Sequence, residues 1–438
     1  MKITAHRVNV GGVGERDLQR GFPAEFEYVA IPVAGIPTAV RWSFLPFVCT
    51  LPFEDTELAF TTGSMAKLCG LFFFAIYFLY YSPFSTKRSF PRPSSAMWWF
   101  LGYIVVLVLN GLFLSEEFVG DFFTRCFTQV QLAVLLWIAS DLLKDEKMAR
   151  SVLLAFSIAS GLLAVGNLLQ LPGFYQEQAG RVTAFEYNQN LVAVNMAFAA
   201  VISIGLCLYT SYRIFPSKIL LFVLTLCLLV VMVRTGSRGG VAGFVIGSSI
   251  YLLPYWRSKR TWIAIVLVIL SVAAVLYITA GDSAVLERWR QTYYEGDLAG
   301  RDEIYAIVGD MILEKPVLGW SVPGNYELGR REGGRFFSTA RDAHNTFLAL
   351  LLEVGIVGAT PFFVGLWLCG LSAWRARLGN LGLLPLALMF TLVACMMSGN
   401  FVPMKQLWLM LAFTLATAPT MPRELGKQFP ALLRIRPS

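Results

Sequence analysis

Residues 191–209 read LVAVNMAFAAVISIGLCLY and contain no charged side chain. A helix needs about 20 consecutive, mainly apolar residues to cross a lipid bilayer, so this stretch is long enough for one span. Similar runs recur along the whole 438-residue chain, which is 56% hydrophobic and only 15% charged. Soluble domains average about 25% charged residues. The sequence therefore predicts an all-α, polytopic membrane protein.

We predict about twelve transmembrane helices from such apolar runs. The first is the weakest, because Arg41 and several prolines interrupt it. The predicted helices cover residues 40–53, 65–81, 97–114, 122–143, 152–171, 191–209, 219–233, 240–256, 262–280, 354–374, 383–399 and 406–418.

Charged residues in the short connections predict how the chain crosses the membrane. Basic side chains gather at 87–92 and 257–260, after even-numbered helices, whereas acidic side chains gather at 54–57 and 116–121, after odd-numbered ones. Because cytoplasmic loops of membrane proteins are enriched in Lys and Arg, the even-numbered connections are predicted to be cytoplasmic. The net charge of +8 then reflects topology rather than nucleic-acid binding.

This topology predicts the division of the chain. Residues 1–39 and 419–438 are predicted to be cytoplasmic, and residues 281–342 to form one long periplasmic loop. The first nine transmembrane helices are expected within 40–280, and the last three within 343–418.

The long loop 281–342 contains a predicted surface helix. It opens at Arg301 with acidic residues in its first turn, continues with apolar residues at helical spacing, and ends before Pro316. We expect this helix to lie along the membrane surface. The residues from Gly319 to Gly334 are rich in glycine and are predicted to form a loop.

His344 is the first candidate for catalysis, since His6 is the only other histidine in the chain. Asp342 can cap a helix beginning at Ala343, which would put His344 near the positive end of the helix dipole and favour a neutral imidazole. A neutral imidazole can accept a proton from a sugar hydroxyl. The alternative is a structural histidine hydrogen-bonded at the interface. No acid or thiol stands at metal-ligand spacing from His344, so we predict no metal site.

Arginines on the predicted outer side are candidates for binding phosphate. Arg234 and Arg238 flank a tight turn, Arg181 follows the fifth helix, and Arg288 and Arg301 lie in the long loop. A guanidinium binds phosphate in a planar, bidentate manner, and the glycines of the turn could bring backbone N–H groups to an anion. Pairing with lipid headgroups or with nearby acids is favoured for the remaining cluster, which consists of Arg330, Arg331 and Arg335.

Together these residues resemble the O-antigen ligase and polymerase superfamily of bacterial envelope glycosyltransferases, and most closely its O-antigen ligases. Arg181 with Asn188 and Asn190 is similar to an arginine and asparagine in an earlier outer loop of that family. The other matching segments are Arg234-Thr235-Gly236-Ser237-Arg238-Gly239, Gly300-Arg301, Lys315-Pro316-Val317-Leu318-Gly319, Ala343-His344-Asn345-Thr346-Phe347-Leu348 and Glu353-Val354-Gly355-Ile356-Val357-Gly358.

The resemblance implies an enzyme of the bacterial inner membrane that transfers O-antigen polysaccharide from undecaprenyl pyrophosphate onto lipid A-core at the periplasmic face. It implies an inverting reaction that uses neither metal nor cofactor. The residues implied are His344 as general base, Arg181, Arg234, Arg238 and Arg301 for the pyrophosphate, and Asn190, Asn345 and Arg288 in support.

Two other functions stay open. A glycan polymerase or a protein O-oligosaccharyltransferase would share these motifs, because the motifs identify the superfamily rather than the acceptor. A transporter for a lipid-linked sugar or an anion is the second alternative. Transporters place charges near the bilayer midplane, whereas these arginines are predicted at helix ends and in a loop.

Overall fold

The structure is a computed structural model. It describes residues 36–54, 64–81, 91–178, 180–185, 188–210, 217–255, 294, 300–333 and 340–417. Contacts between residues divide the chain into two units, Met1–Gly35 and Ile36–Ser438, and all described residues belong to the second. The predicted helix at 262–280 lies outside the described residues, as do Arg288, Arg335 and the predicted cytoplasmic tail at 419–438.

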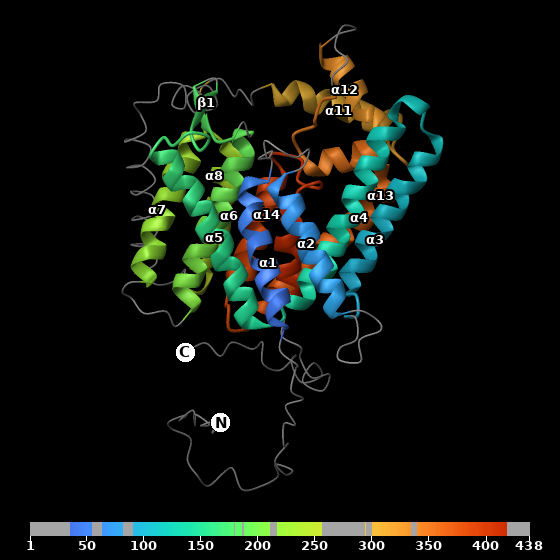
Figure 1. The fold of residues 1–438 in the computed structure, drawn as a ribbon. Helices are drawn as coiled ribbons and strands as arrows, with labels where there is room; N and C mark the ends of the chain where they lie inside the picture. Colours follow the sequence, from blue (N-terminus) through green and yellow to red (C-terminus); the bar gives the residue numbers. More distant parts are fainter. Residues whose placement is uncertain are drawn as a thin grey trace, which may run out of the picture. The chain divides into compact units, whose positions relative to one another are not determined.

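Helices form nearly all of the regular structure in the described residues, which confirms the predicted helical class (Figure 1). Each predicted transmembrane segment other than 262–280 contains an observed helix or most of one. The helices are α1 (Thr38–Thr50), α2 (Met65–Tyr80), α3 (Ser95–Asn110), α4 (Val119–Leu142), α5 (Glu146–Leu168), α6 (Gln189–Tyr209), α7 (Ile219–Arg234), α8 (Arg238–Ser249), α11 (Arg301–Glu314), α12 (Pro323–Gly333), α13 (Thr346–Ala376), α14 (Leu384–Met396) and α15 (Lys405–Ala416). Short 3-10 turns cover Leu51–Phe53, Gly111–Phe113, Glu116–Phe118 and Ile250–Tyr255.

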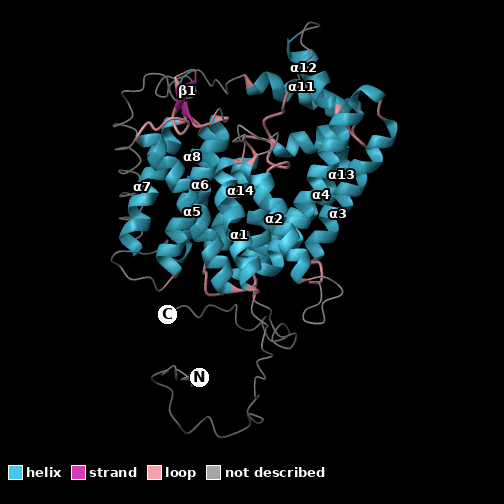
Figure 2. Ribbon diagram, viewed as in Figure 1, coloured by secondary structure: helices cyan, strands magenta, loops and turns pink. Residues whose placement is uncertain are grey.

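One short β-hairpin between α5 and α6 departs from the all-α prediction (Figure 2). Strand β1 (Gln176–Gln178) pairs antiparallel with β2 (Arg181–Thr183), and Glu177 lies opposite Val182. Gly180 between them has a φ of 69°, which glycine adopts without steric cost. The hairpin fixes the backbone that carries Arg181.

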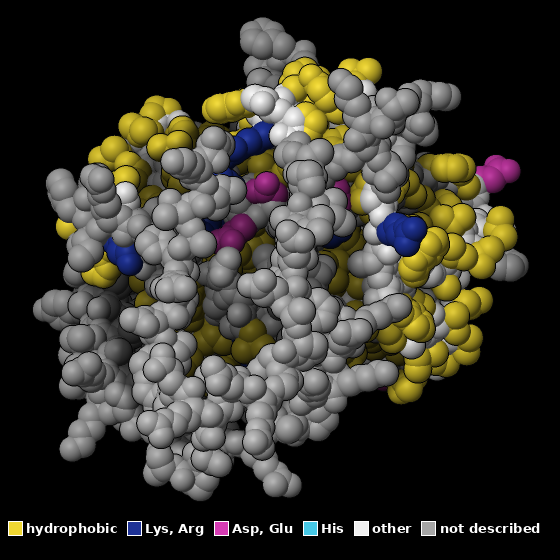
Figure 3. All heavy atoms as spheres, turned by 90° about the horizontal axis from the view of Figure 1, so that it is seen from below, with side chains coloured by type: hydrophobic (Ala, Val, Ile, Leu, Met, Phe, Trp, Pro, Cys, Tyr) yellow, Lys and Arg dark blue, Asp and Glu magenta, His cyan; other side chains and the backbone are white. Residues whose placement is uncertain are grey.

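The helices have the length and composition of a multi-pass membrane protein. Within the described residues, four helices are long and apolar enough to cross a membrane, and α2, α3, α7, α14 and α15 are shorter apolar helices. Large hydrophobic side chains face outward, such as Leu79 at 72% exposure, Trp98 at 63% and Trp367 at 67%. Hydrophobic side chains also cover much of the described surface in Figure 3. Such exposure suits a lipid environment rather than water.

The charge-free helix α6 lies inside the bundle. It packs against α5, α7, α8 and α14, and its side chains from Leu191 to Ser203 are buried. Because neighbouring helices cover this part of α6 on all sides, none of its faces meets water, which explains why this run contains no charged residue. On the other side of the bundle α13 packs along α3.

Residues 300–333 pack with the start of α13 around a small second core, at the end of the bundle where β1 also lies (Figure 1). The helix predicted from Arg301 is confirmed as α11, with Asp302 and Glu303 in its first turn. The loop predicted after Gly319 is wrong, because Pro323–Gly333 forms helix α12. Long-range contacts outweigh the glycine content there. The second core joins both helices to the start of α13 and consists of Ile304, Val308, Met311, Leu328, Ala343, Ala349 and Leu352.

Candidate functional site

His344 stands just before α13 rather than inside it, which corrects the predicted cap. The N-cap is Asn345, whose Oδ1 accepts hydrogen bonds from the backbone N–H groups of Phe347 (2.9 Å) and Leu348 (3.2 Å). His344 itself has a φ of 50°, in the left-handed region, where the Cβ of a non-glycine residue meets unfavourable steric contacts. Asn345 is therefore a capping residue, and Asp342 does not cap α13. A non-glycine residue keeps this conformation only where its surroundings hold it, as they also do at Gln170, Phe185 and Ser321.

Contacts from three segments hold the backbone around His344. The Tyr305 hydroxyl, from α11, donates to the His344 carbonyl oxygen at 3.4 Å. The Thr346 hydroxyl donates to the Gly399 carbonyl oxygen at 2.6 Å and accepts from the backbone N–H of Phe401 at 3.1 Å. These residues belong to α11, α13 and the connection between α14 and α15.

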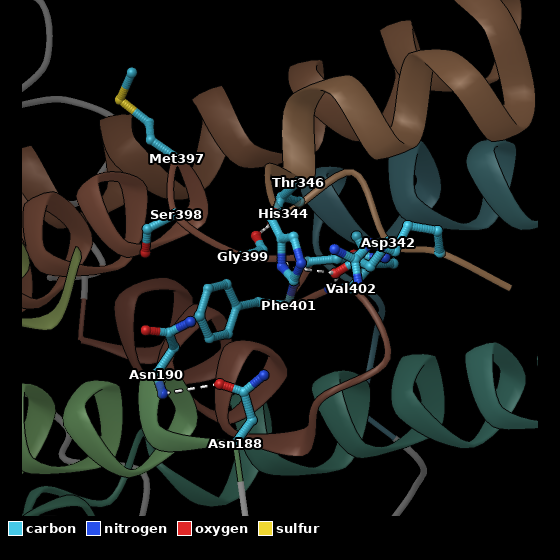
Figure 4. A network of polar contacts seen from close by, with 12 residues as sticks. Asn188, Asn190, Asp342, His344, Thr346, Met397, Ser398, Gly399, Phe401 and Val402 are labelled. Carbon is cyan, nitrogen blue, oxygen red and sulfur yellow. Dashed lines mark hydrogen bonds and ion pairs between the residues drawn. The ribbon is translucent and has the colours of Figure 1, made fainter. Parts of the chain in front are cut away.

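The His344 side chain is partly accessible, at 28% exposure, and faces Asp342 (Figure 4). Its Nδ1 lies 3.9 Å from Oδ2 of Asp342. Burial lowers the pKa of His344 below its ordinary value; Asp342 opposes this shift, whereas the charges of Arg301 and Arg341 add to it. The imidazole is therefore neutral at neutral pH and able to accept a proton. Burial is the main cause of the lowered pKa of His344, whereas the sequence suggested the helix dipole.

Arg181, Asn190 and the turn between α7 and α8 lie together. Nε of Arg181 donates to the Thr235 carbonyl oxygen at 2.7 Å, and its Nη2 donates to Oδ1 of Asn190 at 3.3 Å. Asn188 caps α6 and accepts from the backbone N–H of Asn190 at 2.9 Å. Two separate segments of the family resemblance thus meet at one place, because the hairpin turns Arg181 toward the α7–α8 turn.

Arg234 and Arg238 occupy the two ends of that turn, as predicted. Arg234 is the last residue of α7 and lies over the Tyr175 ring, 5.9 Å from its centroid. Arg238 is the first residue of α8, and the preceding Ser237 is its N-cap. Both arginines are half-buried. The turn whose Thr235 carbonyl oxygen accepts from Arg181 is therefore bounded by two further arginines.

The glycines of the turn serve close packing more than anion binding. The N–H of Gly236 donates to the Val233 carbonyl oxygen (2.9 Å), and the N–H of Gly240 donates to the Ser237 hydroxyl (3.4 Å). The predicted use of these two N–H groups for an anion is therefore wrong. A Cβ on Gly239 would lie 2.0 Å from the Ser398 hydroxyl, so glycine lets α8 approach that residue.

The connection between α14 and α15, residues 397–404, links the arginines to His344. Ser398 packs against Gly239, next to the turn that carries Arg234 and Arg238 (the arginine turn). Gly399 and Phe401 are hydrogen-bonded to Thr346. In Figure 4 the Phe401 side chain is drawn between Asn190 and His344. The arginine turn and the segment that carries His344 therefore both contact this one connection. No sequence pattern indicated this role, because the connection carries no charged residue before Lys405.

The arginines of α12 are engaged with acids, as the sequence favoured. Arg330 forms a bidentate pair with Glu327, and Arg331 forms one with Glu314 at 2.7 and 2.8 Å. Arg301 behaves differently: it starts α11, and its charge acts on His344. Tyr305, one turn further along α11, was not foreseen, although its spacing from Arg301 puts both residues on one helix face.

Among the described residues, no group of three or more His, Cys, Asp or Glu side chains could hold a metal ion. The functional groups that gather here are guanidinium groups, one imidazole, amides and hydroxyls. Such a set can bind an anion and move a proton.

Part of the chain matches a known family model. Residues 220–363 match a family model described as O-antigen ligase. No curated protein matches the chain significantly. The matched region contains Arg234, Arg238, Arg301 and His344, and Arg181 is bonded to it through Thr235. This match supports the assignment of the chain to the O-antigen ligase superfamily that its motifs predict.

Proposed function

We propose that the protein is an O-antigen ligase: a membrane glycosyltransferase that transfers O-antigen polysaccharide from undecaprenyl pyrophosphate onto lipid A-core. The observation that carries this proposal is the approach of the arginine turn and of His344 to the same connection, residues 397–404. An anionic donor and a hydroxyl acceptor could meet there.

In the proposed step, neutral His344 takes the proton from the acceptor hydroxyl. The hydroxyl oxygen bonds to the anomeric carbon of the donor as the bond from that carbon to the pyrophosphate oxygen breaks. The leaving pyrophosphate keeps the electron pair, and the configuration at the carbon inverts. A positioned base typically contributes about 10²–10⁴-fold to such a rate.

Arginines would stabilise the charge of the departing pyrophosphate. We assign this role to Arg181, Arg234, Arg238 and Arg301, and each charge-assisted hydrogen bond contributes about 1.5–3 kcal/mol. When charge develops on an oxygen, oriented hydrogen-bond donors often contribute more to the rate than any other group. Asn190 supports the arginines by accepting from Arg181. These cations could take the place of a divalent metal ion.

The alternation of basic and acidic connections supports an active site facing the periplasm of the bacterial inner membrane, with both termini in the cytoplasm. On this proposal residues 281–342 are periplasmic, and the arginines stand at helix ends, where lipid headgroups and donor phosphates lie. A transporter would instead need charges along a path across the bilayer.

Reconstitution tests the proposal directly. The purified protein is placed in liposomes with undecaprenyl-pyrophosphate glycan and lipid A-core, with and without EDTA. We expect glycosylated lipid A-core under both conditions. Longer lipid-linked glycan would identify a polymerase, and glycosylated protein an oligosaccharyltransferase. Movement of the donor across the bilayer without any product would identify a transporter, and product that forms only without EDTA would show a need for metal.

A further inference from the structure

Helix α13 is broken at Gly355, and the break decides where the short segment before it points. Gly355 has φ 59° and ψ −168°, which are not helical values, so the 31-residue element consists of a short first segment, residues 346–354, and a longer second segment, residues 356–376. The predicted transmembrane segment 354–374 corresponds to the second segment. His344 lies two residues before the first segment, so the direction of that segment sets the position of the imidazole.

Residues 316–321 restore the backbone hydrogen bonds that the break removes. Before the break, the Leu352 carbonyl oxygen accepts from the N–H of Trp320 (2.7 Å), and the Glu353 carbonyl oxygen accepts from the N–H of Ser321 (2.8 Å). After it, the N–H of Ile356 donates to the Pro316 carbonyl oxygen at 2.9 Å. Buried backbone groups are costly without partners, so the break is a built feature.

Two glycines make this pairing possible. A Cβ on Gly355 would lie 2.3 Å from the Val317 carbonyl oxygen, and a Cβ on Gly319 would lie 2.6 Å from the Gly355 nitrogen. Both residues have positive φ values, 59° and 72°. The Lys315–Gly319 and Glu353–Gly358 segments of the family resemblance are therefore two halves of one junction.

An ion pair between half-buried Arg125 and buried Glu353 fastens this junction to the neighbouring helix α4. Nη2 of Arg125, in α4, donates to Oε2 of Glu353 at 2.6 Å, and Nε of Arg125 forms an ion-pair contact with Oε1. The Glu353 side chain is only 7% exposed. Asn110, the last residue of α3, donates to the Leu318 carbonyl oxygen at 2.7 Å. Thus α3 and α4 both hold the point where α13 bends.

We infer that Arg125 and Glu353 are a positioning pair: their two-point contact at the break in α13 sets the direction of its first segment and so places His344. This inference rests on the proposed function. Neither residue reaches the imidazole directly, because Glu353 faces α4 and lies nine residues beyond His344.

The chemistry of the pair favours positioning over simple stabilisation. Replacing a buried ion pair with apolar residues of similar volume is often neutral or stabilising, so burial alone does not require charges here. A bidentate guanidinium–carboxylate contact instead fixes distance and orientation together. Productive geometry is sensitive to such placement, and an error of about 1 Å can reduce a rate about 100-fold.

The main test replaces the pair with apolar residues in the double variant Arg125→Met/Glu353→Leu. We expect the folded variant to keep its thermal stability and its KM for the donor, while kcat falls by about 10- to 100-fold. The single variant Arg125→Lys, which keeps the charge but loses the planar fork, is expected to lower kcat in the same direction. Glu146→Gln, which breaks the Arg150–Glu146 pair on α5, is the matched control and should leave kcat unchanged.

A second readout follows the imidazole itself. The chain has two histidines, so a His6→Gln background with a histidine-free affinity tag leaves one imidazole signal in NMR of ¹⁵N-histidine-labelled protein. If the pair positions His344, the double variant shifts this signal and its titration midpoint, whereas Glu146→Gln leaves both unchanged. This measurement needs no substrate.

The outcomes separate the inference from the proposed function. Absence of glycan transfer by the unaltered protein would reject the function, and the NMR signal alone would then decide the inference. An unshifted imidazole together with a kcat within about twofold of the unaltered protein would overturn positioning. If the double variant does not fold, the same two measurements on Arg125→Lys decide.

Discussion

Nε of Arg181 lies 2.7 Å from the carbonyl oxygen of Thr235, although 54 residues separate them in the chain. The contact joins the β-hairpin to the turn that carries Arg234 and Arg238. Because Nη2 of Arg181 also donates to Asn190, this arginine orients its neighbours as well as supplying charge. The Arg181 guanidinium, proposed to bind pyrophosphate, is thus held by the backbone of the turn before any donor arrives, which reduces the cost of ordering it on binding.

His344→Ala should abolish glycan transfer and leave the protein folded. The side chain is partly accessible, so its removal leaves no large cavity, while the proposed base is lost. We would measure lipopolysaccharide capping in cells and thermal stability of the purified protein. His6→Ala is the control for loss of a histidine and should cap normally. Normal capping by His344→Ala would remove this residue as the base.

Arg238→Lys should impair donor use although it keeps the positive charge. A lysine cannot reproduce the planar fork, and loss of one charge-assisted hydrogen bond, worth about 1.5–3 kcal/mol, lowers kcat/KM for the donor about tenfold or more. Steady-state kinetics over a range of donor concentrations measures this. Arg330→Lys, at an arginine engaged with Glu327, is the matched control. Equal kinetics for both variants would mean that bidentate binding at Arg238 is not needed.

The pH dependence should report the protonation of His344. The base must be neutral, so activity falls as pH drops through its pKa, which burial holds below the ordinary value of 6.5. The acid limb of kcat/KM should therefore lie below pH 6.5. The negative charges of Asp342 and Glu332 raise this pKa, whereas the positive charges of Arg301 and Arg341 lower it. Asp342→Asn should accordingly move the limb to lower pH, and a shift to higher pH would contradict the assignment.

Gly355→Ala should prevent correct folding. An alanine there would have to keep a positive φ, and its Cβ would lie 2.3 Å from the Val317 carbonyl oxygen. The junction therefore cannot close without backbone movement. Gly309→Ala is the control: a Cβ there meets nothing within 4 Å, and alanine should stabilise α11 by about 1 kcal/mol. Thermal unfolding in detergent compares the two. A stable Gly355→Ala protein would mean that the junction adapts more easily than its contacts indicate.

Much of the architecture could be predicted from local patterns. Apolar runs such as 191–209 predicted helices, and the acidic first turn after Arg301 predicted where α11 begins. The segment Pro323–Gly333 defeated the same reasoning, because glycines suggested a loop while Leu328 enters a core formed with α11 and α13. Local propensity is a weak prior wherever long-range contacts supply the stabilisation.

Sequence alone determined the class of protein and the chemical groups of its site, because hydrophobicity, helix spacing and the arginine and histidine motifs are properties of neighbouring residues. Only the tertiary structure decided that Arg181 reaches Thr235, that His344 stands outside α13, and that Arg125 meets Glu353. Contacts between residues 54 or 228 positions apart depend on how whole helices pack against each other, and no local pattern records that packing.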